Sequence, residues 1–171
     1  MSDEELLDIV DDDDRVLRSA PRRTVLDEYH IHRAVMFFIF DRDGNVFVNK
    51  RSANKEIYPG CWSIAFGGHV RAGESYDAAA IREVQEETGL FDRPLEIGAF
   101  KKRTGDEREN VKVYRVVASQ DLDLFPEEIE QGQFATMAEL NVMLGRFDFL
   151  PETRDLLSIL TAYTARPESG G

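Results

Sequence analysis

The longest apolar run in the chain is AVMFFIF, residues 34–40, which predicts a strand covered on both faces. Asp43-Gly44 separates this run from VFVNKR, residues 46–51, and the pair predicts a hairpin with a tight turn. After the loop SANKEIYPG, the segment WSIAF predicts a third strand. Two further strands are expected at about 95–103 and 111–118, on either side of the charged loop TGDEREN.

Other patterns predict an N-terminal hairpin and four helices. Residues 6–10 and 15–18 flank the run Asp11–Asp14, so we expect a short hairpin with a solvated acidic tip that lacks the ligand spacing of a calcium loop. Helices are predicted from Pro21 to about Glu28, over 75–88 with Gly89 as terminator, at about 136–144, and over 152–163.

Strands and helices in this order predict an α/β (α+β) fold, an α/β/α sandwich with a mixed β-sheet between helices. A chain of 171 residues that is 42% hydrophobic can form one core, so we expect a single domain over 1–166. Residues 1–30 would form its N-terminal hairpin and short helix, and residues 167–171 a flexible tail.

Composition narrows the class of partner. The chain has 21 Lys and Arg against 33 Asp and Glu, and this net charge of −12 argues against extended nucleic acid or an anionic membrane as the ligand. A small anionic substrate remains compatible with it when bound cations reverse the local potential. Cys61 is the single cysteine, and the acidic N-terminus does not resemble a signal peptide, so we expect a cytoplasmic protein without disulfides. The oligomeric state cannot be predicted from these features.

Three carboxylates share one face of the predicted helix 75–88, because Glu83, Glu86 and Glu87 are spaced i, i+3 and i+4. Two such charges ~6 Å apart repel by about 3 kcal/mol at an effective dielectric near 20. An expected Gly-Gly turn and the step Gly73-Glu74 bring a fourth carboxylate toward the helix start. Convergence of hard oxygen ligands predicts Mg²⁺, for which Mn²⁺ can substitute, and hence diphosphate chemistry.

The spacing also matches a known family. Gly68, five residues, Glu74, seven residues and then REVQEETGL make residues 68–90 resemble a complete Nudix box. This resemblance implies a Mg²⁺-dependent hydrolase in which metal-activated water attacks a phosphorus atom of a diphosphate linkage. It implies a catalytic set of Arg82, Glu83, Glu86 and Glu87, in which Arg82 holds the glutamates by salt bridge. The implied metal ligands are Gly68, through its carbonyl, with Glu83, Glu86 and Glu87.

The resemblance leaves the general base and the substrate open. A base or additional ligand could come from Glu74 or from the later loop, which holds Asp106, Glu107 and Glu109. Nucleoside 5′-di- or triphosphates are the expected substrates. Nucleoside diphosphate sugars, dinucleoside polyphosphates and prenyl diphosphates are alternatives.

From Ile31 to Leu90 the chain also resembles the isopentenyl-diphosphate isomerase branch of the same superfamily, in HRAVMFFIFDRDGNVFVNKR, YPGCW and GGHVRAGES. This likeness implies that Arg51 and Lys55 bind the substrate diphosphate and that His32 and His69 occupy positions of metal ligands. The branch places its catalytic cysteine where this chain has Gly67. We therefore expect hydrolysis in preference to isomerisation, or to a binding module, which has no need for so many converging acids.

Overall fold

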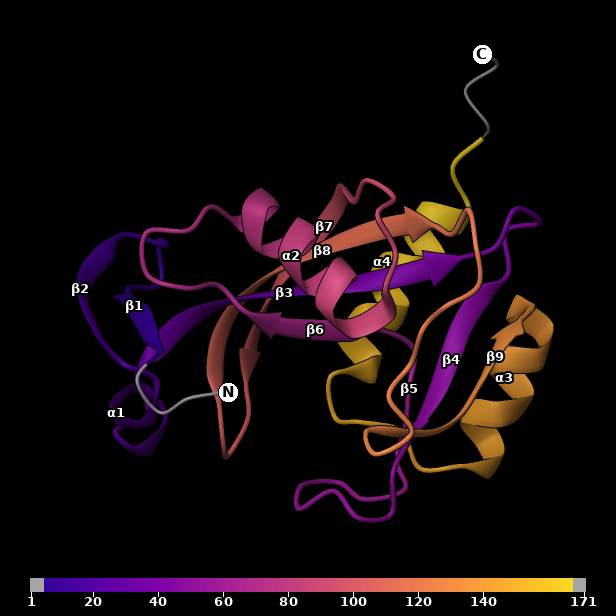
Figure 1. Cartoon of the computed structure of the whole chain (residues 1–171), viewed down its shortest axis with the longest axis horizontal. Helices are drawn as coiled ribbons and strands as arrows, with labels where there is room; N and C mark the ends of the chain where they lie inside the picture. The colour runs from indigo at the N-terminus through magenta and orange to yellow at the C-terminus, as the bar shows by residue number, and fades with distance from the viewer. Residues whose placement is uncertain (1–4, 168–171) are drawn as a thin grey trace.

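A computed structural model describes residues 5–167, and within them the long strand β3 (Ile31–Phe40) forms the centre of a nine-stranded mixed sheet (Figure 1). Along one edge β3 pairs in parallel with β8 (Arg108–Val117), which pairs antiparallel with β7 (Leu95–Arg103). Along its other edge β3 meets β1 (Leu6–Val10) at His32, then β6 (Phe66–His69), and finally β4 (Val46–Arg51) at Phe40.

The strands β3 and β4 diverge after their contact, and this divergence makes room for a cavity. β4 (Val46–Arg51) pairs with β3 at Val46 and Phe40 and then follows β9 (Ile129–Ala135) and β5 (Trp62–Ser63). The tight turn between them contains Gly44, whose φ of 83° lies in the left-handed region that glycine tolerates. One sheet therefore separates into two arms, β6 on β3 and β5 on β4.

Helices cover both faces of the sheet, which confirms the predicted α/β/α sandwich. On one face α2 (Tyr76–Thr88) buries Ala79, Ala80 and Val84 among the odd-numbered side chains of β3 (Figure 1). On the other face α3 (Met137–Arg146) and α4 (Thr153–Thr164) cover the even-numbered side chains of β3. The run 34–40 is fully buried because alternate residues enter two different hydrophobic clusters.

The N-terminal hairpin is present as β1 (Leu6–Val10) and β2 (Val16–Pro21), followed by α1 (Arg22–Asp27). The expectation of a solvated acidic tip was wrong for Asp14, whose carboxylate accepts hydrogen bonds from Arg33, Tyr76 and Asn110. Asp12 is exposed but pairs with Arg103 at 3.0 Å. The tip therefore connects the hairpin to the rest of the sheet, because its acidic side chains form hydrogen bonds and ion pairs with basic and polar residues there.

Two strand boundaries were predicted wrongly, and one strand was not predicted. The segment WSIAF is not one strand: β5 ends at Ser63, whose hydroxyl hydrogen-bonds both the N–H and the carbonyl of Ala65, and β6 (Phe66–His69) then joins β3. β9 was not predicted, because IEQGQFA has weak alternation and an internal glycine. β8 begins at Arg108, three residues before the predicted start, so Glu109 lies in a strand and not in a loop.

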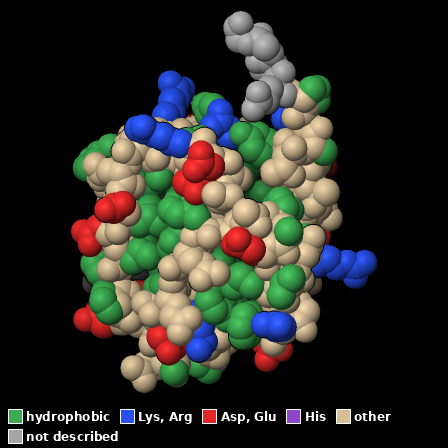
Figure 2. All heavy atoms as spheres, turned by 90° about the vertical axis from the view of Figure 1, so that its right-hand side faces the viewer, with side chains coloured by type: hydrophobic (Ala, Val, Ile, Leu, Met, Phe, Trp, Pro, Cys, Tyr) green, Lys and Arg blue, Asp and Glu red, His purple; other side chains and the backbone are tan. Residues whose placement is uncertain are grey.

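The surface at the β4 and β9 end of the molecule carries scattered acidic and basic side chains between hydrophobic ones (Figure 2). No helix in residues 5–167 is both long enough and apolar enough to cross a bilayer. Of the predicted flexible tail, residues 168–171 lie outside the described residues.

Candidate active site

The ends of α2 fix the position of its three glutamates. The Ser75 hydroxyl accepts a hydrogen bond from the Ala78 N–H at 3.1 Å and caps the helix start. Gly89 ends the helix with a φ of 71°. With its apolar face buried against the sheet, the helix places Glu83 against β6.

Glycine is required at position 68 because the Glu83 carboxylate occupies the space where a side chain would be. A Cβ built on Gly68 would lie 2.1 Å from the Glu83 Cδ, a distance that no folded protein tolerates. At Gly67 a Cβ would lie 2.9 Å from the Val35 carbonyl oxygen. The expected Gly-Gly turn was therefore wrong: both residues lie in β6, where they permit close approach of α2 and β3.

Arg82 holds the acids together through all five of its N–H groups. It donates two hydrogen bonds to Glu74, both of 2.9 Å, and one of 3.0 Å to the His69 carbonyl. Its Nη1 donates to Glu83 at 2.7 Å and to Glu86 at 3.3 Å. Burial alone would raise the pKa of Glu74, but the bonds from Arg82 and from the Arg71 N–H hold it below its usual range. Arg82 therefore positions the glutamates, and both Glu74 oxygens are engaged.

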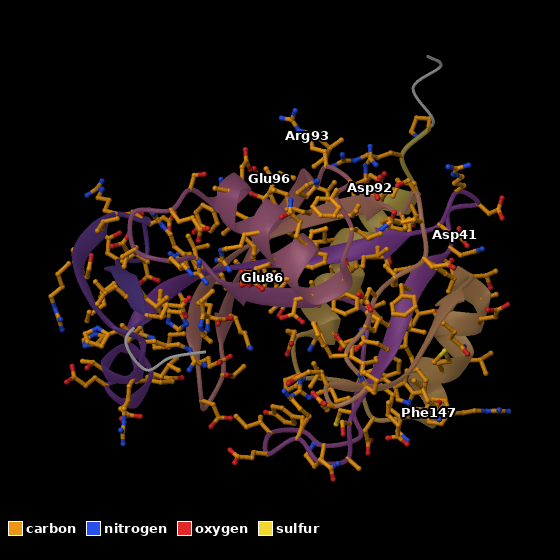
Figure 3. All side chains as sticks on the ribbon, viewed as in Figure 1. Asp41, Glu86, Asp92, Arg93, Glu96 and Phe147 are labelled. Atoms are coloured by element: carbon orange, nitrogen blue, oxygen red, sulfur yellow. The ribbon has the colours of Figure 1, made fainter. Side chains whose placement is uncertain are left out.

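The three box glutamates differ in their environments. Glu83 is 5% exposed, whereas the Glu86 side chain is 51% exposed and projects from α2 (Figure 3). Burial, opposed by Arg82 and aided by the neighbouring Glu87 and Glu86 charges, raises the pKa of Glu83 to about 7. Burial and the charges of Glu128 and Glu86 also raise the pKa of Glu87. The site therefore holds more negative charge than its own cations neutralise.

A cavity of about 360 Å³ lies between the two arms of the sheet. Glu87 and Gly68 line it, whereas Glu83 lies behind Gly68. Arg51 and Lys55 also line it: Arg51 donates to the Ile57 carbonyl from Nη2 at 2.9 Å and from Nε at 3.2 Å, and Lys55 pairs with Glu128. Cationic and anionic groups thus line the same space that is available to a substrate.

A second cluster consists of His32, His69 and Glu109, whose potential ligand atoms lie within 4.8 Å of one another. His69 and Glu109 line the same cavity, and His32 is buried next to them. Glu109 Oε1 is 3.3 Å from His32 Nε2 and 3.4 Å from His69 Nε2. His32 Nδ1 contacts the His30 carbonyl at 3.1 Å, and the buried His32 Nε2 forms no hydrogen bond within the described residues. Burial would raise the pKa of Glu109, but contacts with His32, His69 and Lys102 hold it below its usual range.

The remaining acids from this region lie at different depths. Glu107 lines the cavity and its carboxylate accepts a hydrogen bond from Lys102 Nζ at 2.6 Å. Asp106 is exposed and lines a smaller neighbouring pocket. Of the aromatic residues near the motif, Phe66 is buried in the core, and Tyr76 packs under Arg33 and Lys112.

Comparison with known proteins agrees with this geometry. The NUDIX domain family model matches residues 30–155, and the chain belongs to that family. It is 36% identical to an uncharacterized Nudix hydrolase of Streptomyces coelicolor, over 95% of this chain and 91% of the relative, and 38% identical to one of Pseudomonas aeruginosa, over 95% of each. It is 31% identical to an isopentenyl-diphosphate Delta-isomerase of Clavibacter sepedonicus, over 80% and 76%.

Among solved structures, a protein of Deinococcus radiodurans superposes with a TM-score of 0.75 and 22% identity, over 90% of this chain and 98% of that one. This likeness confirms the fold. The family assignment and the 36–38% identical relatives identify the chain as a Nudix hydrolase family enzyme.

Two parts of the site were not predicted from the sequence. Glu109 was expected in a loop, so its contact with the two histidines was not foreseen; the only indication was the pair Glu107 and Glu109 two residues apart. Glu128 and Glu152 also line the cavity, and neither lies in a motif that marks it.

Proposed function

We propose that this Nudix enzyme hydrolyses a diphosphate linkage in nucleoside 5′-di- or triphosphates and depends on Mg²⁺. The observation that carries the proposal is the group of buried and half-buried carboxylates around Gly68, beside a 360 Å³ cavity that Arg51 and Lys55 also line. Three carboxylates that share one arginine retain negative charge and are suited to a bound divalent ion. Cations that line the same cavity are suited to phosphate oxygens.

The residues present fit Mg²⁺. Glu83, Glu86 and Glu87 supply hard oxygen ligands, and the Gly68 carbonyl is the fourth proposed ligand. The raised pKa values of Glu83 and Glu87 support this assignment, because burial and, after it, the neighbouring carboxylate charges raise them, and a bound cation would favour the ionised forms. When bound, Mg²⁺ would polarise a phosphoryl oxygen and lower the pKa of a bound water.

The His32, His69 and Glu109 cluster also fits a divalent ion. If His32 Nδ1–H donates to the His30 carbonyl, then the neutral ring directs the Nε2 lone pair toward the Glu109 carboxylate. Two facing lone pairs in a buried space repel each other unless a proton or a metal ion lies between them. We infer that this cluster can hold a second ion on the same cavity.

Among the acids considered as a general base, we propose Glu107. Glu74 directs both oxygens to Arg82, and Glu109 is buried beneath the two histidines. Glu107 lines the cavity, and within residues 5–167 its carboxylate has one hydrogen-bond partner, Lys102, which leaves an oxygen able to accept a proton from a water in the cavity. Lys55 would exchange Glu128 for substrate phosphate, and Arg51 would donate to phosphate through Nη1 while its Nε and Nη2 keep the Ile57 carbonyl; both are charge-assisted bonds.

The proposal is tested by phosphate and pyrophosphate release from a nucleotide panel with Mg²⁺. We expect Glu83→Gln and Glu87→Gln to lower kcat by about 10²-fold or more, as removal of charge-stabilising groups does elsewhere. Glu96→Gln is the matched control, because Glu96 is exposed on β7 and does not line the cavity (Figure 3). Unchanged rates in both site variants would remove the proposed site.

An isomerase acting on isopentenyl diphosphate is the second candidate. The cluster of two histidines and one glutamate and the 31% identical Clavibacter relative favour it. Against it, Gly67 provides no thiol at the position where the isomerase branch has a catalytic cysteine. Turnover of isopentenyl diphosphate by the purified protein would establish this alternative and displace hydrolysis as the main reaction.

A further inference from the structure

A second pocket of about 190 Å³ opens beside the main cavity and shares one wall with it. The shared residues are Arg51, Lys102, Glu107, Leu150 and Glu152. Sites for whole drug-sized ligands start at roughly 300 Å³, so this pocket is sized for one part of a substrate. A molecule with its phosphates in the main cavity could extend directly into it.

One side of the second pocket is apolar and includes an aromatic ring. Ile57, Tyr58, Leu150 and Pro151 line it, and Ile57 and Tyr58 are 59% and 39% exposed. Exposed large apolar side chains grouped at a concave polar site are typical of ligand contacts. A tyrosine supplies a flat face on which a planar ring can stack.

The loop that presents Tyr58 is held in an uncommon conformation. Tyr58 has a φ of 50°, in the left-handed region that a bulky residue rarely adopts. The two hydrogen bonds from Arg51 to the Ile57 carbonyl restrain the loop next to it. Strained backbone that neighbouring contacts maintain is found preferentially at ligand-binding positions.

The lining of the pocket also includes hydrogen-bond acceptors. Within residues 5–167, the carboxylates of Asp106 and Glu152 form no ion pair and no hydrogen bond, and both line the pocket. Lys102 directs its charge to Glu107 and Glu109. Because Lys102 is already paired, the unpaired carboxylates of Asp106 and Glu152 favour a ligand group that donates hydrogen bonds and disfavour a further phosphate.

We propose that this pocket binds the nucleobase of the substrate, with the ring stacked on Tyr58 and its N–H or amino edge donating to Glu152. The inference rests on the proposed nucleotide hydrolysis, since it needs the diphosphate in the main cavity. A prenyl chain has no donor to offer the carboxylates, so the pocket selects nucleotides over prenyl diphosphates. Guanine suits it best, because its ring N–H and amino group match one carboxylate.

The test compares calorimetric binding of guanosine diphosphate and of pyrophosphate, both with Mg²⁺, to the parent protein and to pocket variants. Tyr58→Ala should weaken binding of guanosine diphosphate about tenfold, within the range known for base stacking, while Tyr58→Phe should retain it. Glu152→Gln should also weaken it about tenfold through loss of the charged acceptor. Tyr58→Ala should leave pyrophosphate binding unchanged, and Glu152→Gln, which removes a negative charge from the wall that the two cavities share, should not weaken it. Phe91→Ala removes another exposed aromatic side chain, outside the pocket, and should change neither ligand.

Binding and turnover separate this inference from the proposed function. The nucleobase pocket would be overturned if the parent bound guanosine diphosphate no more tightly than pyrophosphate. It would also be overturned if the parent, Tyr58→Ala and Glu152→Gln bound guanosine diphosphate with equal affinity. Equal weakening of both ligands would indicate a structural role and would also overturn it. Selective binding without any phosphate release would instead support the pocket and contradict the hydrolase proposal.

Discussion

Replacing Glu83 by Gln removes a carboxylate that burial destabilises, so the metal-free variant should be more stable than the parent at alkaline pH. The pKa of Glu83 rises from its ordinary value of 4.5 to about 7. One pH unit corresponds to 1.36 kcal/mol, so ionisation of Glu83 lowers the free energy of unfolding by about 3 kcal/mol at most. Glutamine fits the same space and keeps an oxygen that accepts the hydrogen bond from Arg82.

The sign of the effect fixes its pH range. Below about pH 4.5 Glu83 is protonated in both the folded and the unfolded chain, and its carboxyl group does not penalise folding. Between pH 4.5 and about 7 the unfolded chain releases this proton first, so the stability of the parent falls relative to the variant. Above about pH 7 the difference is constant.

Urea unfolding of parent and Glu83→Gln at pH 5 and pH 8, with chelator present, measures this difference. We expect the free energy of unfolding of the variant, relative to that of the parent, to increase by about 1–3 kcal/mol from pH 5 to pH 8. Glu86→Gln is the control, because its side chain is 51% exposed and should give less than about 0.5 kcal/mol. Added Mg²⁺ should then stabilise the parent more than Glu83→Gln. A variant no more stable than the parent at pH 8 would refute the reasoning.

Three further changes test the rest of the site. Arg82→Lys cannot reproduce the paired hydrogen bonds to Glu74 and should lower the free energy of unfolding by about 3 kcal/mol, as urea titration would show; a loss below about 0.5 kcal/mol would contradict its positioning role. Gly68→Ala should displace the adjacent carboxylate and reduce Mn²⁺ affinity in a paramagnetic titration, whereas Gly105→Ala, with open space around it, should bind Mn²⁺ like the parent. Glu107→Gln should lower kcat about 10²-fold and leave Mn²⁺ affinity unchanged. A loss of Mn²⁺ affinity as large as the loss of kcat would indicate that Glu107 is a metal ligand and not the general base.

The sequence determined the features that depend on local spacing. Helix α2, its three glutamates on one side and its glycine terminator follow from residues at most 14 apart, since i, i+3 and i+4 spacing fixes direction on a helix. The buried strand 34–40 and the two C-terminal helices were also predicted, because the spacing of their hydrophobic residues indicates which faces are covered.

Only the tertiary structure decided which distant residues meet. His32 and Glu109 contact each other because β3 and β8 pair in parallel with these two residues in register, 77 positions apart in the chain. His69 joins them through the antiparallel pairing of β6, which places it opposite Ala34. Strand register depends on how whole faces pack against the helices, and no local pattern around any of these residues encodes it.

The same reason applies to Tyr58, a single aromatic residue in the loop IYPG, whose sequence shows no periodic pattern. Its position beside the cavity depends on the divergence of β3 and β4 and on the bonds from Arg51 that hold the loop. Local spacing thus specified the group of carboxylates that we propose to bind the metal, whereas packing between segments far apart in the chain specified the shape of the space around it.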